Sequence, residues 1–535
     1  MKRTLLLLAA IFAIGIFTFG QHWVPQGLGW TATSRGVMNV FPVSAKVAWA
    51  AGYDGSGANG PCQDVSVTTN GGTTWTPKTV TGATGLAISM ITAVNADTAW
   101  TAMYKVSSGT QGVYQTTNGG TTWTRQGSTS MFTASTSFPD ILYFWDANNG
   151  CAIGDPVSSK FEIYTTPDGG TTWTQVPPGN LPTITSGEAG WTTDCSVSGT
   201  NIWFGTNKGH VYHSADMGVT WTVGSPSNMT GKNTWPAMKD DNNGFCLKFY
   251  STTDTLDLLA STSDGGTTYT PATYTGQLFN NQLQFVPGTT STWAASGVDA
   301  TNQPTRVGIV YSFDDGASFN AVDQDVSGTQ ITCQAFFNDS VAYAGTFTTG
   351  ATDGILVLTA PVVPAVASFT ANDTAIALHS HVLFTNTSTG IKTGTSLYQW
   401  TFQGGTPSSS TSKNPSAITY NTAGTYNVTL TITNVFGSVN TLVKHGYIYV
   451  GGVGVDEISQ NNIKVYPNPV RDVFTIETDY NMQEIQVFNI TGQLMIDKIV
   501  SGKSQKVNTT SLHSGVYNLK VKTDNGSFDR KVVVQ

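Results

Sequence analysis

Short apolar runs separated by polar turns recur along most of the chain, whereas no long stretch of the mature chain shows the 3.6-residue period of an amphipathic helix. The recurring unit is an apolar strand, a short polar turn and a second apolar strand. It occurs seven times, near Val40, Thr92, Phe144, Ser196, Met238, Phe285 and Phe336. Charged residues make up only 11% of the chain, and Gly, Thr, Ser and Asn are abundant. The pattern predicts an all-β protein.

A second repeat has the form Ser/Thr, any, Asp/Asn, any, Gly, any, Ser/Thr, aromatic. Its six copies begin at Thr68, Thr116, Thr166, Ser214, Thr262 and Ser312. Their third residues are Asn70, Asn118, Asp168, Asp216, Asp264 and Asp314, and their aromatic residues are Trp75, Trp123, Trp173, Trp221, Tyr269 and Phe319. The aromatic residues are separated by 48, 50, 48, 48 and 50 positions. A period of this length suits the four strands of one propeller blade.

Each copy places Asn-Gly, Asp-Gly or a related pair between two strand-like runs, which predicts a hairpin turn. We expect the Asn or Asp side chain to accept a hydrogen bond from the backbone two residues on, and Gly to supply a positive φ. Asn and Asp replace one another among the copies, but general acid catalysis requires a carboxyl group. The repeat is therefore predicted to be structural.

The seventh unit lacks a copy of the repeat, because one period beyond Phe319 lies in a region of different composition. Its last strand is GILVLT at 354–359, and it has no outer strand of its own. The segment His22–Pro25 resembles the Trp-Thr-Pro that follows the first copy. We predict a seven-bladed propeller over residues 21–360, closed by an N-terminal strand that removes an exposed sheet edge. Six or eight blades are the alternatives.

These repeats resemble the Asp-box, or BNR, repeats of sialidase-like propellers, and the resemblance covers residues 21 to about 360. The resemblance implies a β-propeller. It implies no activity, since the box is a structural hairpin in the families that carry it.

A new region begins at Pro361 and extends to residue 451. The segment WTFQGGTP from Trp400 and the segment TYNTAGTYNVTLTITNVFGS at 419–438 resemble the PKD domain, an immunoglobulin-like β-sandwich. The family's Gly-Asp-Gly turn is replaced by Gln-Gly-Gly-Thr-Pro. Val428, Leu430 and Ile432 alternate with polar residues and predict a strand over a core. The resemblance implies a spacer or an adhesive module.

The last region, residues 456–535, begins within the linker-like stretch GGVGVDEISQNN. The pieces YPNP, NITGQ, SGVY and FDRKVVVQ resemble the type A C-terminal sorting domain of type IX secretion in Bacteroidota, although this chain does not end on a basic residue. The motif residues are Tyr466, Pro467, Asn468, Pro469, Gly492, Gly515 and Tyr517. The resemblance implies a second small β-sandwich and export by the type IX machinery. The domain would then be removed, with release or surface attachment of the rest.

Residues 1–20 have the layout of a signal peptide, with two basic residues before an apolar run at 5–19. That run is short for a membrane span and nothing similar follows, so we expect no transmembrane segment after cleavage. The net charge is −8, and residues 21–360 contain 11 Lys+Arg against 23 Asp+Glu. A nucleic-acid partner is therefore not expected.

The residue types for metal or redox chemistry are sparse. Five cysteines in no CxxC spacing are expected to be small buried side chains, with at most an opportunistic disulfide: Cys62, Cys151, Cys195, Cys246 and Cys333. His210 and His213 are expected to face opposite sides of a strand, and His379 with His381 lacks a third ligand. We predict no metal and no cofactor.

Residues at the starts of the innermost strands are expected to line one mouth of the central channel. They are Arg35, Asp140, Glu188, Trp191, Asp194, Trp235, Asn280 and Asn281. Trp191 and Trp235 are either sugar-stacking platforms or packing residues. A sialidase-type arginine cluster is not expected, since the propeller region contains only Arg35, Arg125 and Arg306, and Arg125 follows a box on an outer strand.

Two functions remain open at this point. The first is an exported surface or released protein whose propeller binds a glycan or an extracellular protein, as an adhesion scaffold. The alternative is a glycoside hydrolase in which Asp140 and either Glu188 or Asp194 act as an acid/base pair; otherwise these carboxylates are turn residues. Hydrolysis requires two carboxyl groups about 5 to 9.5 Å apart across an open cleft.

Overall fold

A computed structural model describes residues 22–56, 58–127, 131–249, 257–299, 303–346, 354–391, 396–451, 463–524 and 526–535. The predicted signal peptide and most of the predicted linker, at 452–462, lie outside these residues. The described residues contain 47 strands and one three-residue 3-10 helix, η1 (Pro178–Asn180). The predicted all-β fold class is confirmed.

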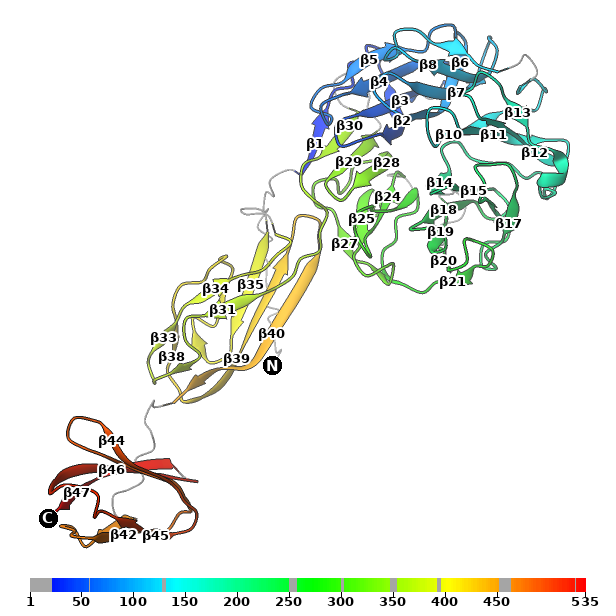
Figure 1. Ribbon diagram of the computed structural model, residues 1–535. Helices are drawn as coiled ribbons and strands as arrows, with labels where there is room; N and C mark the ends of the chain where they lie inside the picture. The colour runs from blue at the N-terminus through cyan, green and yellow to red at the C-terminus, as the bar shows by residue number, and fades with distance from the viewer. Residues whose placement is uncertain are drawn as a thin grey trace, which may run out of the picture. The chain divides into compact units, whose positions relative to one another are not determined.

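The region before residue 360 contains seven four-stranded antiparallel sheets, which follow one another around a ring (Figure 1). Sheet 1 is β2 (Arg35–Pro42), β3 (Ala48–Asp54), β4 (Asp64–Thr68) and β5 (Thr76–Thr79); sheet 2 is β6 (Leu86–Ala93), β7 (Ala99–Lys105), β8 (Gly112–Thr116) and β9 (Thr124–Arg125); sheet 3 is β10 (Pro139–Phe144), β11 (Gly150–Val157), β12 (Lys160–Thr166) and β13 (Thr174–Gln175). Sheet 4 is β14 (Cys195–Ser198), β15 (Asn201–Gly205), β16 (Val211–Ser214) and β17 (Thr222–Gly224); sheet 5 is β18 (Thr234–Met238), β19 (Gly244–Lys248), β20 (Leu259–Thr262) and β21 (Thr270–Pro271). Sheet 6 is β23 (Gln282–Phe285), β24 (Trp293–Gly297), β25 (Gly308–Ser312) and β27 (Ala321–Val322); sheet 7 is β28 (Ile331–Asn338), β29 (Val341–Thr346), β30 (Ile355–Leu358) and β1 (Trp23–Gln26). A short parallel pair, β22 (Thr275–Gly276) with β26 (Ser318–Phe319), accompanies sheet 6.

Buried tryptophans on the second strands connect neighbouring sheets. The indole N–H of Trp100 on β7 donates to the carbonyl of Gly169 in sheet 3 at 2.9 Å, and that of Trp203 on β15 donates to Gly265 in sheet 5 at 2.7 Å. Trp49 makes the corresponding bond from sheet 1 to sheet 2. Because a buried indole N–H without an acceptor is energetically unfavourable, each of these bonds holds one sheet against the next.

The N-terminal strand β1 occupies the outer edge of sheet 7, antiparallel to β30, with Trp23 opposite Leu358. His22, just before β1, is fully buried. Its Nε2 lies 2.9 Å from Asp323 Oδ2 and its Nδ1 lies 2.7 Å from Asp325 Oδ2. Burial alone would lower the pKa of His22, but the hydrogen bonds and negative charges of the two carboxylates raise it to about 9.

Residues beyond 360 form two further groups of sheets. The first contains a two-stranded sheet, β31 (Phe369–Ala371) with β34 (Phe384–Asn386), and a three-stranded sheet, β33 (His381–Val382), β38 (Ile418–Tyr420) and β36 (Gly405–Thr406). Its five-stranded sheet has the order β32 (Ala375–Ile376), β40 (Val439–Val450), β39 (Gly424–Thr433), β35 (Leu397–Phe402) and β37 (Ser409–Ser410). On β39 the side chains of Val428, Leu430 and Ile432 are fully buried, as the alternation predicts.

The last group contains a three-stranded and a four-stranded sheet. The first has the order β41 (Ile463–Tyr466), β42 (Val473–Thr478) and β45 (Ser504–Asn508), and the second has the order β44 (Leu494–Ile499), β43 (Met482–Phe488), β46 (Gly515–Thr523) and β47 (Gly526–Val534). The alternating buried side chains of β46 and β47 face a shared core with Phe474 and Ile476 of β42. This arrangement is a small β-sandwich.

Candidate functional site

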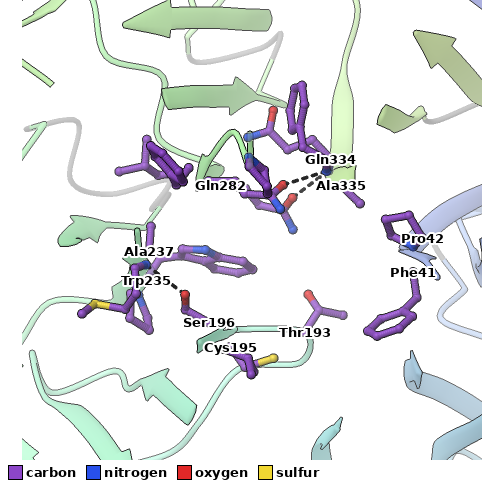
Figure 2. Close-up of a pocket in the computed structure, with 18 of the residues that line it drawn as sticks. Phe41, Pro42, Thr193, Cys195, Ser196, Trp235, Ala237, Gln282, Gln334 and Ala335 are labelled. Atoms are coloured by element: carbon purple, nitrogen blue, oxygen red, sulfur yellow. Dashed lines mark hydrogen bonds between the residues drawn. The ribbon is translucent and has the colours of Figure 1, made fainter. Parts of the chain in front are cut away.

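The first strands of the seven sheets, β2, β6, β10, β14, β18, β23 and β28, surround a cavity of about 540 Å³ (Figure 2). We call them the inner strands. Five aromatic side chains line the cavity: Phe41, Tyr143, Trp235, Phe285 and Phe336. Four side-chain amides also line it: Asn39, Gln282, Gln284 and Gln334. Small-molecule sites typically have volumes of about 300–1,000 Å³ and a similar mixture of aromatic and polar groups.

Several inner strands have their exposed backbone N–H groups capped by a side chain of the preceding sheet. Asn39 Oδ1 accepts from the N–H of Ile91 at 3.1 Å, and Ser196 Oγ accepts from that of Met238 at 2.9 Å. Met90 Sδ lies 3.5 Å from the N–H of Leu142. Because an unpaired strand edge otherwise exposes these donors, the side chains satisfy the inner edges of the sheets.

Two glutamines of sheet 6 cap backbone N–H groups of sheet 7 in the same way. Gln282 Oε1 accepts from the N–H of Gln334 at 2.8 Å (Figure 2). Gln284 Oε1 accepts from that of Phe336 at 3.1 Å. Within the described residues, the Nε2 groups of Gln282 and Gln284 make no hydrogen bond and are not among the buried unpaired atoms. The carbonyl end of each amide is thus fixed and the donor end is open to the cavity.

Aromatic side chains of sheets 1 and 3 form another part of the cavity wall. The ring of Phe41 lies 6.0 Å from that of Tyr143, which lies 5.2 Å from that of Trp145. Tyr143 is partly exposed, and burial, with a smaller effect of Cys195, raises the pKa of its hydroxyl to about 12. The hydroxyl therefore stays neutral at physiological pH and is a donor or an acceptor.

Lys239 is the one charged residue that lines the cavity within the described part of the chain. Its Nζ lies 3.1 Å from both carboxylate oxygens of Asp315 and 5.5 Å from the centroid of the Phe285 ring. The positive charge therefore already has an opposite charge beside it.

Of the eight residues predicted at the channel mouth, only Trp235 lines this cavity. Trp191 packs against Phe249, with ring centroids 5.6 Å apart, and Trp235 packs against the same ring at 5.6 Å. Arg35 lies 2.7 Å from Asp64 Oδ2 on β4. Trp191 thus has an aromatic neighbour and Arg35 an acidic one.

The two predicted asparagines hold backbone and side-chain groups in place. Asn281 Nδ2 donates to the carbonyl oxygens of Ile331 and Thr332, at 3.0 and 3.2 Å, and so ties sheet 6 to sheet 7. Asn280 Nδ2 donates to Asp257 Oδ1 at 3.3 Å. Both asparagines are buried.

The three predicted carboxylates are buried, and none lines the cavity. Burial, and secondarily Asp155, raises the pKa of Asp140 well above its usual range. Burial does the same for Asp194, against the opposing effect of the backbone N–H of Gly205. Burial would also raise the pKa of Glu188, but its bonds with His210 Nδ1, Thr206 Oγ1 and the N–H of Thr185 lower it. Each carboxyl group has its own surroundings, away from the cavity.

The predicted turn repeats form identical hydrogen-bonded turns in all six copies. The Asn or Asp oxygen accepts from the backbone N–H four residues later, as in Asn70 with Thr74 at 3.0 Å and Asp168 with Thr172 at 2.8 Å. We expected this bond two residues later. That N–H, on Gly72 in the first copy, instead donates to Thr68 Oγ1 at 2.9 Å. The two positive-φ positions of the turn bring the later N–H back to the carboxamide or carboxylate.

The predicted sorting-motif residues join the strands of the last β-sandwich. Asn468 Oδ1 accepts from the N–H of Val533, and its Nδ2 donates to the carbonyl of Lys531, both at 2.8 Å. The hydroxyl of Tyr517 donates to the carbonyl of His513 at 2.8 Å. Gly492 has a φ of 81° in the turn between β43 and β44. Tyr466 ends β41, Pro467 and Pro469 flank Asn468, and Gly515 begins β46.

The five cysteines are free thiols, and Cys195 alone among them is not fully buried. Burial raises the pKa of each thiol. Across the described ranges, no three His, Cys, Asp or Glu side chains gather in a way that could hold a metal ion. Those ranges also contain no helix with the length and apolarity needed to cross a membrane.

Comparison with protein families identifies two of the C-terminal regions. Residues 464–535 match the secretion system C-terminal sorting domain, and residues 366–445 match the PKD domain. The chain therefore carries the signal for type IX secretion and is exported to the cell surface or beyond it. The type IX machinery is its export partner. A search of curated proteins found no match.

Solved structures with a similar fold are β-propeller proteins. YCF48 from Cyanidioschyzon merolae is 16% identical with a TM-score of 0.45, over 63% of this chain and 99% of that chain. The GH74 enzyme of Niastella koreensis is 14% identical with a TM-score of 0.38, over 92% and 84%. PorZ, a surface component of the type IX secretion system of Porphyromonas gingivalis, is 10% identical with a TM-score of 0.24, over 96% and 100%. These similarities concern the fold alone.

Proposed function

We propose that the region of residues 21–360 is the ligand-binding part of an exported protein, and that the cavity between the inner strands receives a glycan or a segment of an extracellular protein. The observation that carries this proposal is the composition of the cavity wall. Aromatic rings and amide groups converge there from separate sheets, as in binding sites for small ligands. The sorting domain at 464–535 places such a site outside the cell.

The wall of the cavity argues for binding rather than for hydrolysis. A hydrolytic site requires a carboxyl pair at the reacting bond, but no carboxylate lines this cavity within the described residues. Asp140, Glu188 and Asp194 are buried elsewhere. The hydrolase alternative would need a second cleft.

The test is a binding screen with the mature chain on arrays of glycans and of extracellular matrix proteins, run beside a reducing-sugar release assay on the same polysaccharides. We expect retention of at least one ligand class without release of reducing ends. Release of reducing ends would establish the hydrolase alternative, and the absence of any retained ligand would contradict the proposal.

A further inference from the structure

The electrostatics of the cavity disfavour a charged ligand. An ion that enters the cavity loses hydration, and this cost is recovered where an opposite charge or a set of hydrogen bonds replaces the water. No carboxylate or arginine lines the wall formed by the described residues, and the positive charge of Lys239 is already paired with Asp315. An uncharged ligand avoids this cost.

The capped inner edges also disfavour recognition of a peptide main chain. A peptide commonly binds by adding a strand to an open sheet edge, where backbone groups provide the affinity. Here the N–H groups of Ile91, Met238 and Gln334 already donate to side chains of the preceding sheets. A bound segment must therefore be recognised by side chains rather than by a strand edge.

The groups that remain are suited to hydroxyl-rich rings. The open Nε2 groups of Gln282 and Gln284 are hydrogen-bond donors. Each amide is oriented because its Oε1 accepts a hydrogen bond from a backbone N–H of sheet 7. The partly exposed rings of Tyr143 and Phe285 offer apolar surface in the same cavity. Sugar hydroxyl groups accept from such amides, and the C–H faces of sugar rings pack on aromatic rings.

We infer that the cavity binds an uncharged oligosaccharide, with hydroxyl groups that accept from Gln282 and Gln284 and a ring that packs on Tyr143; this inference rests on the proposed binding function. A volume of about 540 Å³ limits the bound part to a short oligosaccharide or to one end of a longer chain.

The test measures the affinity of the mature chain by calorimetry for uncharged oligosaccharides, for oligosaccharides that carry carboxylates, and for uncharged peptides. Gln284→Glu keeps the acceptor for the N–H of Phe336, but replaces the open donor with a negative charge. Tyr143→Leu removes the ring and keeps an apolar side chain. Matched controls are Gln175→Glu, on the exposed strand β13, and Tyr104→Leu, whose ring packs on Phe138 away from the cavity. Thermal unfolding verifies that all four variants fold.

We expect binding of uncharged oligosaccharides that weakens about tenfold or more in both cavity variants and stays unchanged in both controls. Binding of acidic glycans or peptides that the cavity variants weaken would overturn the inference and leave the proposed function intact. If no ligand responds to the cavity variants, both the inference and the proposed use of the cavity are wrong. If Gln284→Glu fails to unfold cooperatively, it is replaced by Gln282→Glu, which makes the same change at the neighbouring amide.

Discussion

The buried pairing of His22 with Asp323 and Asp325 makes the closure of the ring dependent on pH. A folded-state pKa of about 9, against 6.5 for an unperturbed histidine, corresponds to about 3 kcal/mol of stability. Since the folded chain holds the proton more tightly, this stabilisation is complete below pH 6.5. It is lost as the pH rises through about 9.

The perturbation is His22→Gln, which keeps a hydrogen-bond donor but removes the titratable charge. We expect the variant to be less stable than the original chain at pH 6.5 by about 3 kcal/mol, and the difference to shrink toward zero by about pH 10. The assay is denaturant unfolding at several pH values, followed by tryptophan fluorescence. Of the 14 tryptophans, only Trp400 lies outside residues 21–360, so the signal reports the propeller region.

The control is His445→Gln, at an exposed position on β40, which should leave the pH profile unchanged. The reasoning is refuted if the His22→Gln variant and the original chain lose stability in parallel between pH 6.5 and 10. A parallel loss would mean that His22 is not held as an ion between the two carboxylates.

Three further predictions concern single side chains. Gly72→Ala should lower the free energy of unfolding, measured with denaturant, by about 2–3 kcal/mol, because φ is 85° and a Cβ would lie 2.7 Å from Val357. Gly82→Ala, at φ 75° with open space around it, should lower it by about 1 kcal/mol. Equal losses in the two variants would contradict the steric argument. Asp140→Asn should raise the stability of the folded chain at pH 7 and make that stability less dependent on pH. Burial raises the pKa of the Asp140 carboxyl group, so its ionisation at a pH above the unfolded-state pKa destabilises the fold. A loss of stability in the variant would show that the carboxylate has a stabilising partner. Asn468→Ala should lower the stability of the sorting domain by about 1–2 kcal/mol through two lost hydrogen bonds to β47, measured by thermal unfolding of the mature chain, and unchanged melting would refute it.

The repeat architecture was predictable because it depends on patterns within short segments of the sequence. The alternation of apolar residues and the turn residues at fixed spacing are properties of short segments, and the all-β fold follows from them. The burial of Val428 was predictable in the same way. The hydrogen bond of the turn repeat was predicted two residues too early. The sequence shows that an acceptor side chain is present, but it does not show which backbone N–H lies beside that acceptor in the folded turn.

The residues of the cavity wall were less predictable, because the surroundings of a side chain depend on how neighbouring sheets pack. Residues at the starts of the inner strands were predicted to line one mouth of the channel, and of these Trp235 lines the cavity described above. Gln282 directly follows the predicted Asn281, and a shift of one residue along a strand changes the surface that a side chain meets. The polar residues Asn39 and Gln284, each next to apolar residues of an inner strand, were the available signal. Burial of Asp140 is non-local and left no such signal.

The position of β1 in sheet 7 affects how this region of the chain folds. His22 and Asp323 are 301 residues apart in sequence, so the ring closes only through contacts of very high contact order. Until β1 pairs with β30, the edge of β30 is an open template for another strand. Folding of this region should therefore be slow and prone to association between copies of the chain, unless its first and last strands are kept close together.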